Sequence, residues 1–322
     1  MCVLSLRRYI SPMNKLQLPA SRIFLLMLFL LPATSMKAQM TAFPPSDVYQ
    51  QNRLRTIVWS EVAIGVGVTA GLYFLWYKKF PKSRFHFFND NAEWLQIDKV
   101  GHMTTAYNVA VGQYDLMRWS GVREQPSIAI GAGTALIYMS IIEVLDGFST
   151  HWGFSKTDML ANITGCALFA AQQKLWGEQR ASLKFSFHAT PFSKYNPSEL
   201  GNNWRARMLK DYNGQTYWLS FNIHSFLPAN SNFPVWLNAA VGYGGEGMTG
   251  GTVNPKEVNG KAIPEFKRYR QFYLAPDVDF QKIQYNSGFL RSAAFFTQFI
   301  KTPAPALEYN GLKKFKFHPL YF

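Results

Sequence analysis

Three segments between residues 98 and 165 have the composition of helices, and each carries its charged residues at an end. The first begins with DKVGH, the second ends with IIEVLDG, and the third begins with SKTDMLANITG. The connections between them, such as GVREQP, are short. Short connections place consecutive helices side by side and antiparallel. The sequence therefore predicts a bundle in which alternate helix ends meet on the same side.

Two of the apolar runs are long enough to cross a bilayer. Residues 57–77 read IVWSEVAIGVGVTAGLYFLWY and precede a basic cluster, and residues 127–145 are nearly free of charge. The helices predicted at 98–119 and 155–176 carry more polar side chains, so we expect them to be buried or to lie at an interface. We predict an antiparallel bundle of about four membrane or transmembrane helices in a membrane-associated region, residues 56–180.

The character of the chain changes after residue 180. Segments such as LKFSFH and YWLSFNIHSF alternate apolar and polar residues, as half-buried strands do. Residues 181–322 are therefore predicted to form a β-rich C-terminal region, which makes the fold class α+β. The final Phe322 follows alternating aromatic residues, as in the last strand of an outer-membrane barrel, but Pro319 argues against a complete barrel.

The N-terminus indicates export. Basic residues precede the apolar run from Ile23 to Leu31, and the small-residue stretch ATSMKA follows it. This pattern predicts a cleaved signal peptide at residues 1–38, followed by a linker at 39–55. A retained signal anchor is the alternative, and both interpretations carry the following residues out of the cytoplasm. No lipidation cysteine stands at the cleavage junction.

Composition points to a membrane as the neighbour. Charged residues make up 16% of the chain, which is low for a soluble domain, and the formal net charge is +14. Because the sequence contains no nucleic-acid-binding motif, we expect no nucleic acid as a partner. The lipid bilayer is the predicted partner, and an anionic lipid or a cell-wall precursor is the candidate ligand.

Polar residues gather at one predicted end of the bundle. The starts of the helices at 98 and 155 and the end of the helix at 145 must share a side if the helices alternate in direction. Within each helix the polar residues are three or four positions apart, so they share a face. The candidate binding cluster consists of Asp98, Lys99, His102, Glu143, Asp146, Asp158 and Asn162.

This cluster has a structural and a functional interpretation. Helix capping and the helix dipole by themselves favour carboxylates at Asp98 and Asp158. Glu143 and Asp146 stand at a helix C-terminus, where the dipole disfavours them, so these two need a partner such as a lysine or His102. A carboxylate beside an imidazole can also orient a general base, and the same groups can hold a polar headgroup or a divalent cation.

Motifs for cofactors and catalytic metals are absent from the sequence. It has no HExxH, no cysteine-rich zinc pattern, no Walker motif and no nucleophile elbow. We therefore predict no metal site, assign no cofactor and no catalytic residue, and interpret His151 as a surface histidine.

The motifs DKxGH, ExxDG and WGFSxxDxxANxxG together resemble the YfiM-like family of uncharacterised predicted periplasmic lipoproteins. More distantly, they are similar to VanZ-like membrane proteins, with the helix start at Asp98–His102, the glutamate at Glu143 and the third helix at Asp158–Gly165. The resemblance implies a bacterial envelope protein and, on the VanZ-like side, a link to glycopeptide resistance or cell-envelope physiology. This chain departs from the lipoprotein pattern because no cysteine follows its signal.

We expect an exported protein of the bacterial cell envelope with a binding or structural role for the cluster. The alternative from another class is a membrane enzyme acting on a lipid-linked or cell-wall precursor, with Asp98 orienting His102 as a general base. A third hypothesis is an outer-membrane-associated β protein. The expected location is the inner membrane, with the β-rich region on the non-cytoplasmic side, and the outer membrane is the alternative.

Overall fold

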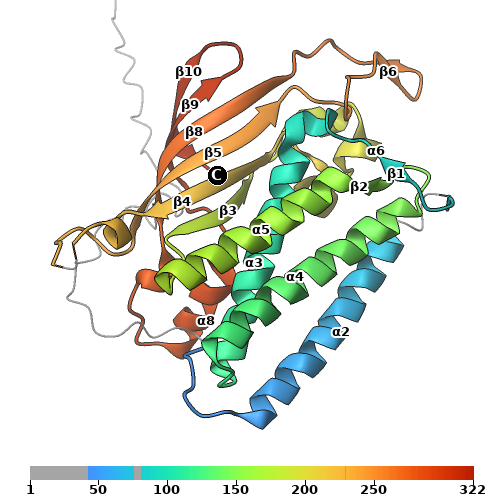
Figure 1. Cartoon of the computed structure of the whole chain (residues 1–322). Coiled ribbons are helices and arrows are strands. Elements are labelled where there is room, and N and C mark those ends of the chain that lie inside the picture. The colour runs from blue at the N-terminus through green and yellow to red at the C-terminus, as the bar shows by residue number, and fades with distance from the viewer. Residues whose placement is uncertain (1–42, 76–80, 229) are drawn as a thin grey trace, which may run out of the picture. The chain divides into compact units, whose positions relative to one another are not determined.

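Four consecutive helices lead to a β-sheet in the part of the chain that the structure describes (Figure 1). The structure is a computed structural model, and it describes residues 43–75, 81–228 and 230–322. The predicted signal peptide, residues 1–38, lies outside these residues. The helices are α2 (Gln51–Leu75), α3 (Ile97–Trp119), α4 (Glu124–Gly147) and α5 (Lys156–Trp176).

Helix α2 begins at Gln51, inside the segment that the sequence predicts to be a linker. Two contacts with the end of α3 hold its first turn. The Gln50 N–H donates to the Ser120 carbonyl at 2.8 Å, and the Arg53 guanidinium lies over the Trp119 ring at 4.7 Å. These contacts are made by polar groups, which is why hydropathy alone places the start of the helix too late.

Helix α3 packs against both α4 and α5. The buried core between these helices contains Tyr107, Ala110 and Phe169. A side chain at Gly165 of α5 would overlap the Met103 carbonyl oxygen of α3. The glycine therefore sets how closely these two helices approach.

The predicted bundle of four membrane helices is not confirmed. Among the described residues, α4 is the one helix that is long and apolar enough to cross a membrane, with a mean hydropathy of 1.9. One polar side chain of α3 and one of α5 donate hydrogen bonds to β3 of the sheet. The Asn108 side-chain amide donates to the Leu183 carbonyl at 2.9 Å, and the Gln172 side-chain amide donates to the Ala181 carbonyl at 2.9 Å. Contact with the sheet therefore accounts for the polar residues Asn108 and Gln172 in these two helices.

Six antiparallel strands form the main sheet, in the order β10-β9-β8-β5-β4-β3. Each strand pairs with the next main strand along the chain, so the connections are simple and local. The expected α+β class is confirmed. The strands are β3 (Ala181–Phe187), β4 (Gln215–Asn222), β5 (Leu237–Glu246), β8 (Tyr269–Val278), β9 (Ala304–Asn310) and β10 (Phe315–Tyr321).

Shorter elements lie between the main ones. Two of them, β1 (Phe87–Phe88) and β2 (Phe154–Ser155), pair in parallel, and β6 (Glu257–Val258) pairs with β7 (Lys261–Ala262). The short helices are α6 (Pro197–Leu200), α7 (Trp204–Lys210) and α8 (Gly288–Thr297), and the 3-10 turns are η2 (Glu93–Gln96), η3 (Phe192–Lys194), η4 (Ile223–Phe226) and η5 (Phe280–Lys282).

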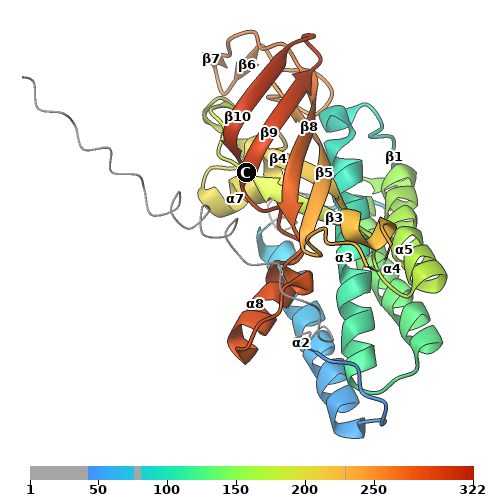
Figure 2. The same cartoon turned by 90° about the vertical axis from the view of Figure 1, so that its left-hand side faces the viewer.

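The sheet meets the bundle along β3 and β4 (Figures 1 and 2). Leu183 of β3 is part of the helical core, and Leu219 of β4 packs against it. The Tyr107 hydroxyl of α3 donates to the Ala181 carbonyl at 3.2 Å. At the start of α3, Asp98 accepts a hydrogen bond from Tyr212, in the loop that precedes β4.

Candidate functional site

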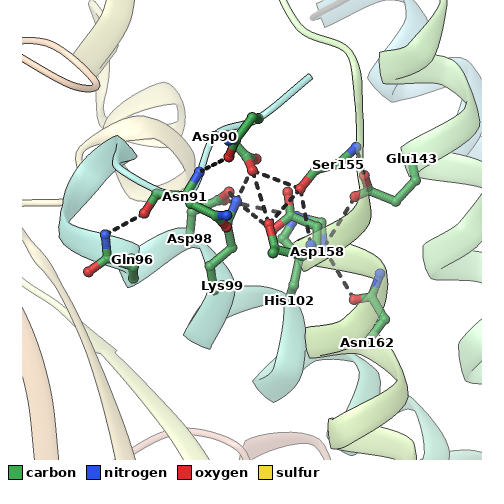
Figure 3. A network of polar contacts seen from close by, with 12 residues as sticks. Asp90, Asn91, Gln96, Asp98, Lys99, His102, Glu143, Ser155, Asp158 and Asn162 are labelled. Carbon is green, nitrogen blue, oxygen red and sulfur yellow. Dashed lines mark hydrogen bonds and ion pairs between the residues drawn. The ribbon is translucent and has the colours of Figure 1, made fainter. Parts of the chain in front are cut away.

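The starts of α3 and α5 and the end of α4 meet in one place (Figure 3). Ser155 caps α5, and its hydroxyl accepts a hydrogen bond from the Asp158 N–H at 3.1 Å. The pairing of Phe87 with Phe154 fastens the segment before α3 to the start of α5. Side chains from three helices and one loop are thereby brought into a common cluster.

Lys99 is surrounded by three carboxylates. Its Nζ lies 2.5 Å from Asp90 Oδ2, 2.7 Å from Asp158 Oδ1 and 3.2 Å from Asp98 Oδ2. Burial opposes the charge of Lys99, but Asp98 and Asp158 outweigh it and raise the pKa of the ammonium. One ammonium cannot balance three ionised carboxylates. The cluster therefore favours the uptake of protons or of another cation.

Asp90 is a member of this cluster that the sequence prediction missed. The Ser155 hydroxyl donates to Asp90 Oδ1 at 2.8 Å, and the Thr157 hydroxyl donates to the same oxygen at 3.2 Å. Burial raises the pKa of Asp158. Burial also opposes the charge of Asp90, but Asp158, Lys99 and Ser155 together outweigh it and lower the pKa of Asp90. Asp90 lies in the loop before α3, so no helical spacing relates it to the other members of the cluster.

His102 lies at the centre of the site. Its Nδ1 is 3.2 Å from Asn162 Oδ1 and 3.5 Å from Glu143 Oε1, and its Nε2 is 3.9 Å from Asp98 Oδ1. Burial opposes the charged imidazole, but the carboxylates of Asp98, Asp158 and Glu143 outweigh it and raise the pKa of His102. Nδ1 of the ring thus lies against Asn162 and Glu143, and Nε2 faces the carboxylate of Asp98.

Glu143 is the most deeply buried carboxylate of the predicted cluster, with 1% of its surface exposed. Its Oε2 accepts a hydrogen bond from the Ser155 N–H at 3.2 Å, while Oε1 has no hydrogen-bond donor. Burial raises the pKa of Glu143 to about 8. Asp146 lies one turn further along α4 and lines the adjacent cavity. His151 is exposed and lies 3.5 Å from Glu199, outside the cluster.

Tyr212, in the loop before β4, donates a hydrogen bond to Asp98 Oδ1 at 2.7 Å. Its ring also packs on Trp94, with the ring centroids 5.1 Å apart. Trp94, Leu95 and Gln96 have φ angles of 47°, 54° and 64°, a left-handed conformation that non-glycine residues rarely adopt. This strained turn holds Trp94 in the cavity wall. Tyr212 is 114 positions from Asp98, so no local pattern predicts the contact.

A cavity of about 670 Å³ joins the cluster to an apolar region between the helices and the sheet. Its titratable lining consists of Asp90, Glu93, Asp98, His102, Asp146 and Asp158. Its apolar lining includes Val109, Met139, Ile142, Phe185, Leu209 and Phe299. Trp94, Trp152, Tyr212 and Tyr217 contribute aromatic rings. No lysine or arginine belongs to the described lining. Lys99 contacts Asp158, which does line the cavity, but is not itself part of the lining.

Three of the lining groups lie close enough to share one metal ion. The side-chain ligand atoms of Asp98, His102 and Asp158 are all within 4.8 Å of one another. Lys99 also contacts both of these carboxylates, so a metal ion would have to share them with its ammonium group. The sequence-based expectation of no metal site stays a prediction.

Residues 86–174 match the model of a family described as predicted periplasmic lipoprotein (DUF2279). The match covers just over a quarter of the chain and includes Asp90 and all seven residues of the predicted cluster. It supports kinship with an uncharacterised periplasmic lipoprotein family and an exported location in the cell envelope, without distinguishing inner from outer membrane. It gives no specific support to the YfiM-like or VanZ-like resemblance. No curated protein and no solved structure matches the chain.

Proposed function

We propose that this chain is a binding protein of the bacterial cell envelope, and that its cavity holds an amphiphile with a positively charged amine at the polar end. The observation that carries the proposal is the cavity of about 670 Å³, which is acidic at one end and apolar along the rest. An amphiphile has the same two parts in the same order. Pockets that bind such ligands combine an apolar lining with a few convergent polar groups.

The charge of the lining favours a cation. Five carboxylates and one histidine line the cavity, although the chain as a whole carries a formal net charge of +14. Burial and the nearby negative charge of Asp98 raise the pKa of Asp158 in this wall. The positive charge around ionised Asp158 is therefore too small to offset these two effects. A bound ammonium group would supply that compensation and would be held by charge-assisted hydrogen bonds.

The aromatic lining favours the same ligand. The rings of Trp94 and Tyr212 form one wall beside Asp98, and Trp152 and Tyr217 lie in the same lining. Aromatic faces attract ammonium groups, most strongly where water is excluded. An anionic lipid or cell-wall precursor, the ligand expected from the sequence, would meet carboxylates here and would bind only with protons or a cation between them.

The proposal is tested with three probes that share one alkyl chain: decylamine, decanol and decanoate. Binding to the purified full chain is measured by isothermal titration calorimetry. We expect decylamine to bind at least about 10-fold more tightly than decanol, because a charge-assisted hydrogen bond contributes about 1.5–3 kcal/mol. Decanoate should bind most weakly. Equal affinities for the three probes, or a preference for decanoate, would overturn the proposal.

Matched variants locate the binding site. Asp98→Asn should remove most of the preference for decylamine over decanol. Glu124→Gln removes one carboxylate from the first turn of α4, where the residue is exposed, and should leave the preference unchanged. Circular dichroism of both variants verifies that the fold is retained.

A second candidate function is an acid–base enzyme, and the position of His102 favours it. Its Nδ1 faces Asn162 and Glu143, which leaves Nε2 beside Asp98 in the cavity lining. In this arrangement Glu143 and Asn162 would orient the general base, in place of the Asp98 expected from the sequence. Incubation with an envelope lipid extract, followed by mass spectrometry, tests it. Turnover that His102→Gln abolishes with the fold retained would support an enzyme.

A further inference from the structure

The main sheet has two cross-strand rows of apolar side chains on one face. The first row runs Leu219, Val241, Leu274, Leu307 and Phe317 from β4 to β10. The second row runs Tyr217, Tyr243, Phe272, Tyr309 and Phe315 across the same strands. Residues paired in register on neighbouring strands point to the same side of a sheet. Both rows therefore belong to one continuous apolar face.

The helices cover only the β4 end of this face. Leu219 packs against the bundle core, and Tyr217 packs against a second cluster that contains Ile97. Figure 2 shows β8, β9 and β10 beyond the part of the sheet that lies next to the helices. The uncovered apolar side chains are between 43% and 72% exposed, and they are Val241, Phe272, Leu274, Leu307, Tyr309, Phe315 and Phe317. We call these seven residues the outer face.

The opposite side of the same strands is buried, and it carries charged pairs beside an apolar cluster that contains Trp218, Tyr273 and Tyr321. Lys184 Nζ lies 2.7 Å from Asp277 Oδ2, and both residues are almost fully buried. Glu308 pairs with His318 at 2.7 Å. The Tyr321 hydroxyl of β10 lies 2.9 Å from the Thr216 hydroxyl of β4, although three strands separate β10 from β4 in the sheet order. The sheet therefore curls around an interior in which buried charged pairs and hydroxyl groups lie beside aromatic rings.

For the charged residues and the outer apolar rows, this distribution is the reverse of what water favours. A sheet with one face in water buries its apolar side chains and exposes its charged ones. Here the strands β8 and β9 bury Asp277 and Glu308 and expose Leu274 and Leu307. Polar side chains inside and apolar side chains outside are the arrangement found where strands face lipid.

Basic residues border the outer face at one end. Arg270 is the second residue of β8, and Lys313 and Lys314 lie in the turn between β9 and β10. The Gly311 N–H donates to the Arg270 carbonyl at 2.8 Å, which places these side chains at the same end of the sheet. All three are exposed. Lysine and arginine beside an apolar surface attract the anionic headgroups of a membrane.

We propose that the outer face lies against the acyl chains of a lipid bilayer, with Arg270, Lys313 and Lys314 at the level of anionic headgroups. The inference concerns a different surface from the cavity, so it does not depend on the proposed ligand. The occupant is lipid because charged groups at one end match anionic headgroups, whereas a partner copy would bring its own basic end to the same surface.

Site-directed labelling tests the proposal. In a background with Cys2→Ser and Cys166→Ser, the variants Leu274→Cys and Leu307→Cys are labelled with the fluorophore NBD and added, as full chains, to vesicles of phosphatidylethanolamine and phosphatidylglycerol. Nitroxides on the acyl chains quench fluorophores that touch them. We expect strong quenching at both positions. Val253→Cys is the matched control, because Val253 is 72% exposed but lies outside the outer face, and it should be quenched little.

Two results would overturn the proposal. One is the absence of quenching at Leu274→Cys and Leu307→Cys, or equal quenching at the control position. The other is a disulfide between two copies of the unlabelled Leu274→Cys variant, together with no quenching of the labelled variant, which would assign the outer face to a second copy of the chain.

A charge substitution provides an independent readout. Leu274→Asp should lower the vesicle-bound fraction more than about 10-fold, because a charge on a lipid-facing strand is strongly unfavourable. Val253→Asp should leave the bound fraction unchanged. Since both positions are exposed, the melting temperatures of both variants in detergent should match that of the unsubstituted chain.

Discussion

Glu143→Gln should flatten the dependence of stability on pH. Burial raises the pKa of Glu143 from 4.5 to about 8, so the folded chain keeps this proton where the unfolded chain has released it. The free energy of unfolding then falls as the pH rises, by about 1.4 kcal/mol per pH unit within that window. Between about pH 5 and pH 8 the loss from this one group is about 3 to 4 kcal/mol. Glutamine keeps the shape of the neutral carboxyl and removes the titration.

His102 acts in the same direction. Its pKa is raised in the folded chain, so the stability that its charged form contributes is complete below the unfolded pKa and is lost as the pH rises through the folded pKa. Asp98 and Asp158 are the carboxylates that raise the pKa of His102 most, and the substitution leaves both in place. The imidazole therefore keeps its own slope in the Glu143→Gln variant.

Guanidinium denaturation of the full chain, followed by tryptophan fluorescence at several pH values from about 5 to 8, measures the effect. The Glu143→Gln variant should gain stability relative to the unsubstituted chain as the pH rises, with little difference near pH 5. Glu124→Gln changes the same charge at the exposed start of α4 and should reproduce the original slope. Parallel curves for Glu143→Gln and the unsubstituted chain would refute the reasoning.

Three further substitutions test the packing and the buried charges. Gly165→Ala should destabilise the fold by about 1–3 kcal/mol, because the added methyl group overlaps the backbone of α3, and thermal denaturation would show it. Asp277→Asn removes the carboxylate between the buried Lys184 and Lys301 and should cost about 3–5 kcal/mol in denaturant titrations at neutral pH. Tyr212→Phe removes a hydrogen bond to a carboxylate and should cost about 1.5–3 kcal/mol, with the lowered stability measured by guanidinium denaturation.

Much of the architecture follows from local patterns. The capping pattern at Ser155 predicts the start of α5, and the structure shows the hydroxyl accepting the Asp158 N–H. Alternation of polar and apolar residues after residue 180 predicts strands, and the α+β class follows. Helix direction and loop length also relate Asp98, Glu143 and Asp158, because antiparallel helices with short connections leave few choices for where their ends lie.

Other features depend on residues that are distant in the chain. Asp90 joins the cluster through β1–β2 pairing, and Tyr212 joins it from the β-rich region. The polar residues of α3 and α5 are compatible with either a membrane bundle or a sheet contact, and only the position of Leu183 and its strand distinguishes the two.

The amino-acid sequence by itself determined the helices, the strands and the set of carboxylates at the helix ends, because capping and periodicity are properties of neighbouring residues. Tertiary structure alone decided which face of the sheet is buried. An alternating strand such as β8 can turn either Asp277 or Leu274 inward, and the curl of the sheet around Lys184, Lys301 and Asp277 makes that choice. The same packing encloses the cavity, whose acidic and apolar parts come from segments that meet only after folding.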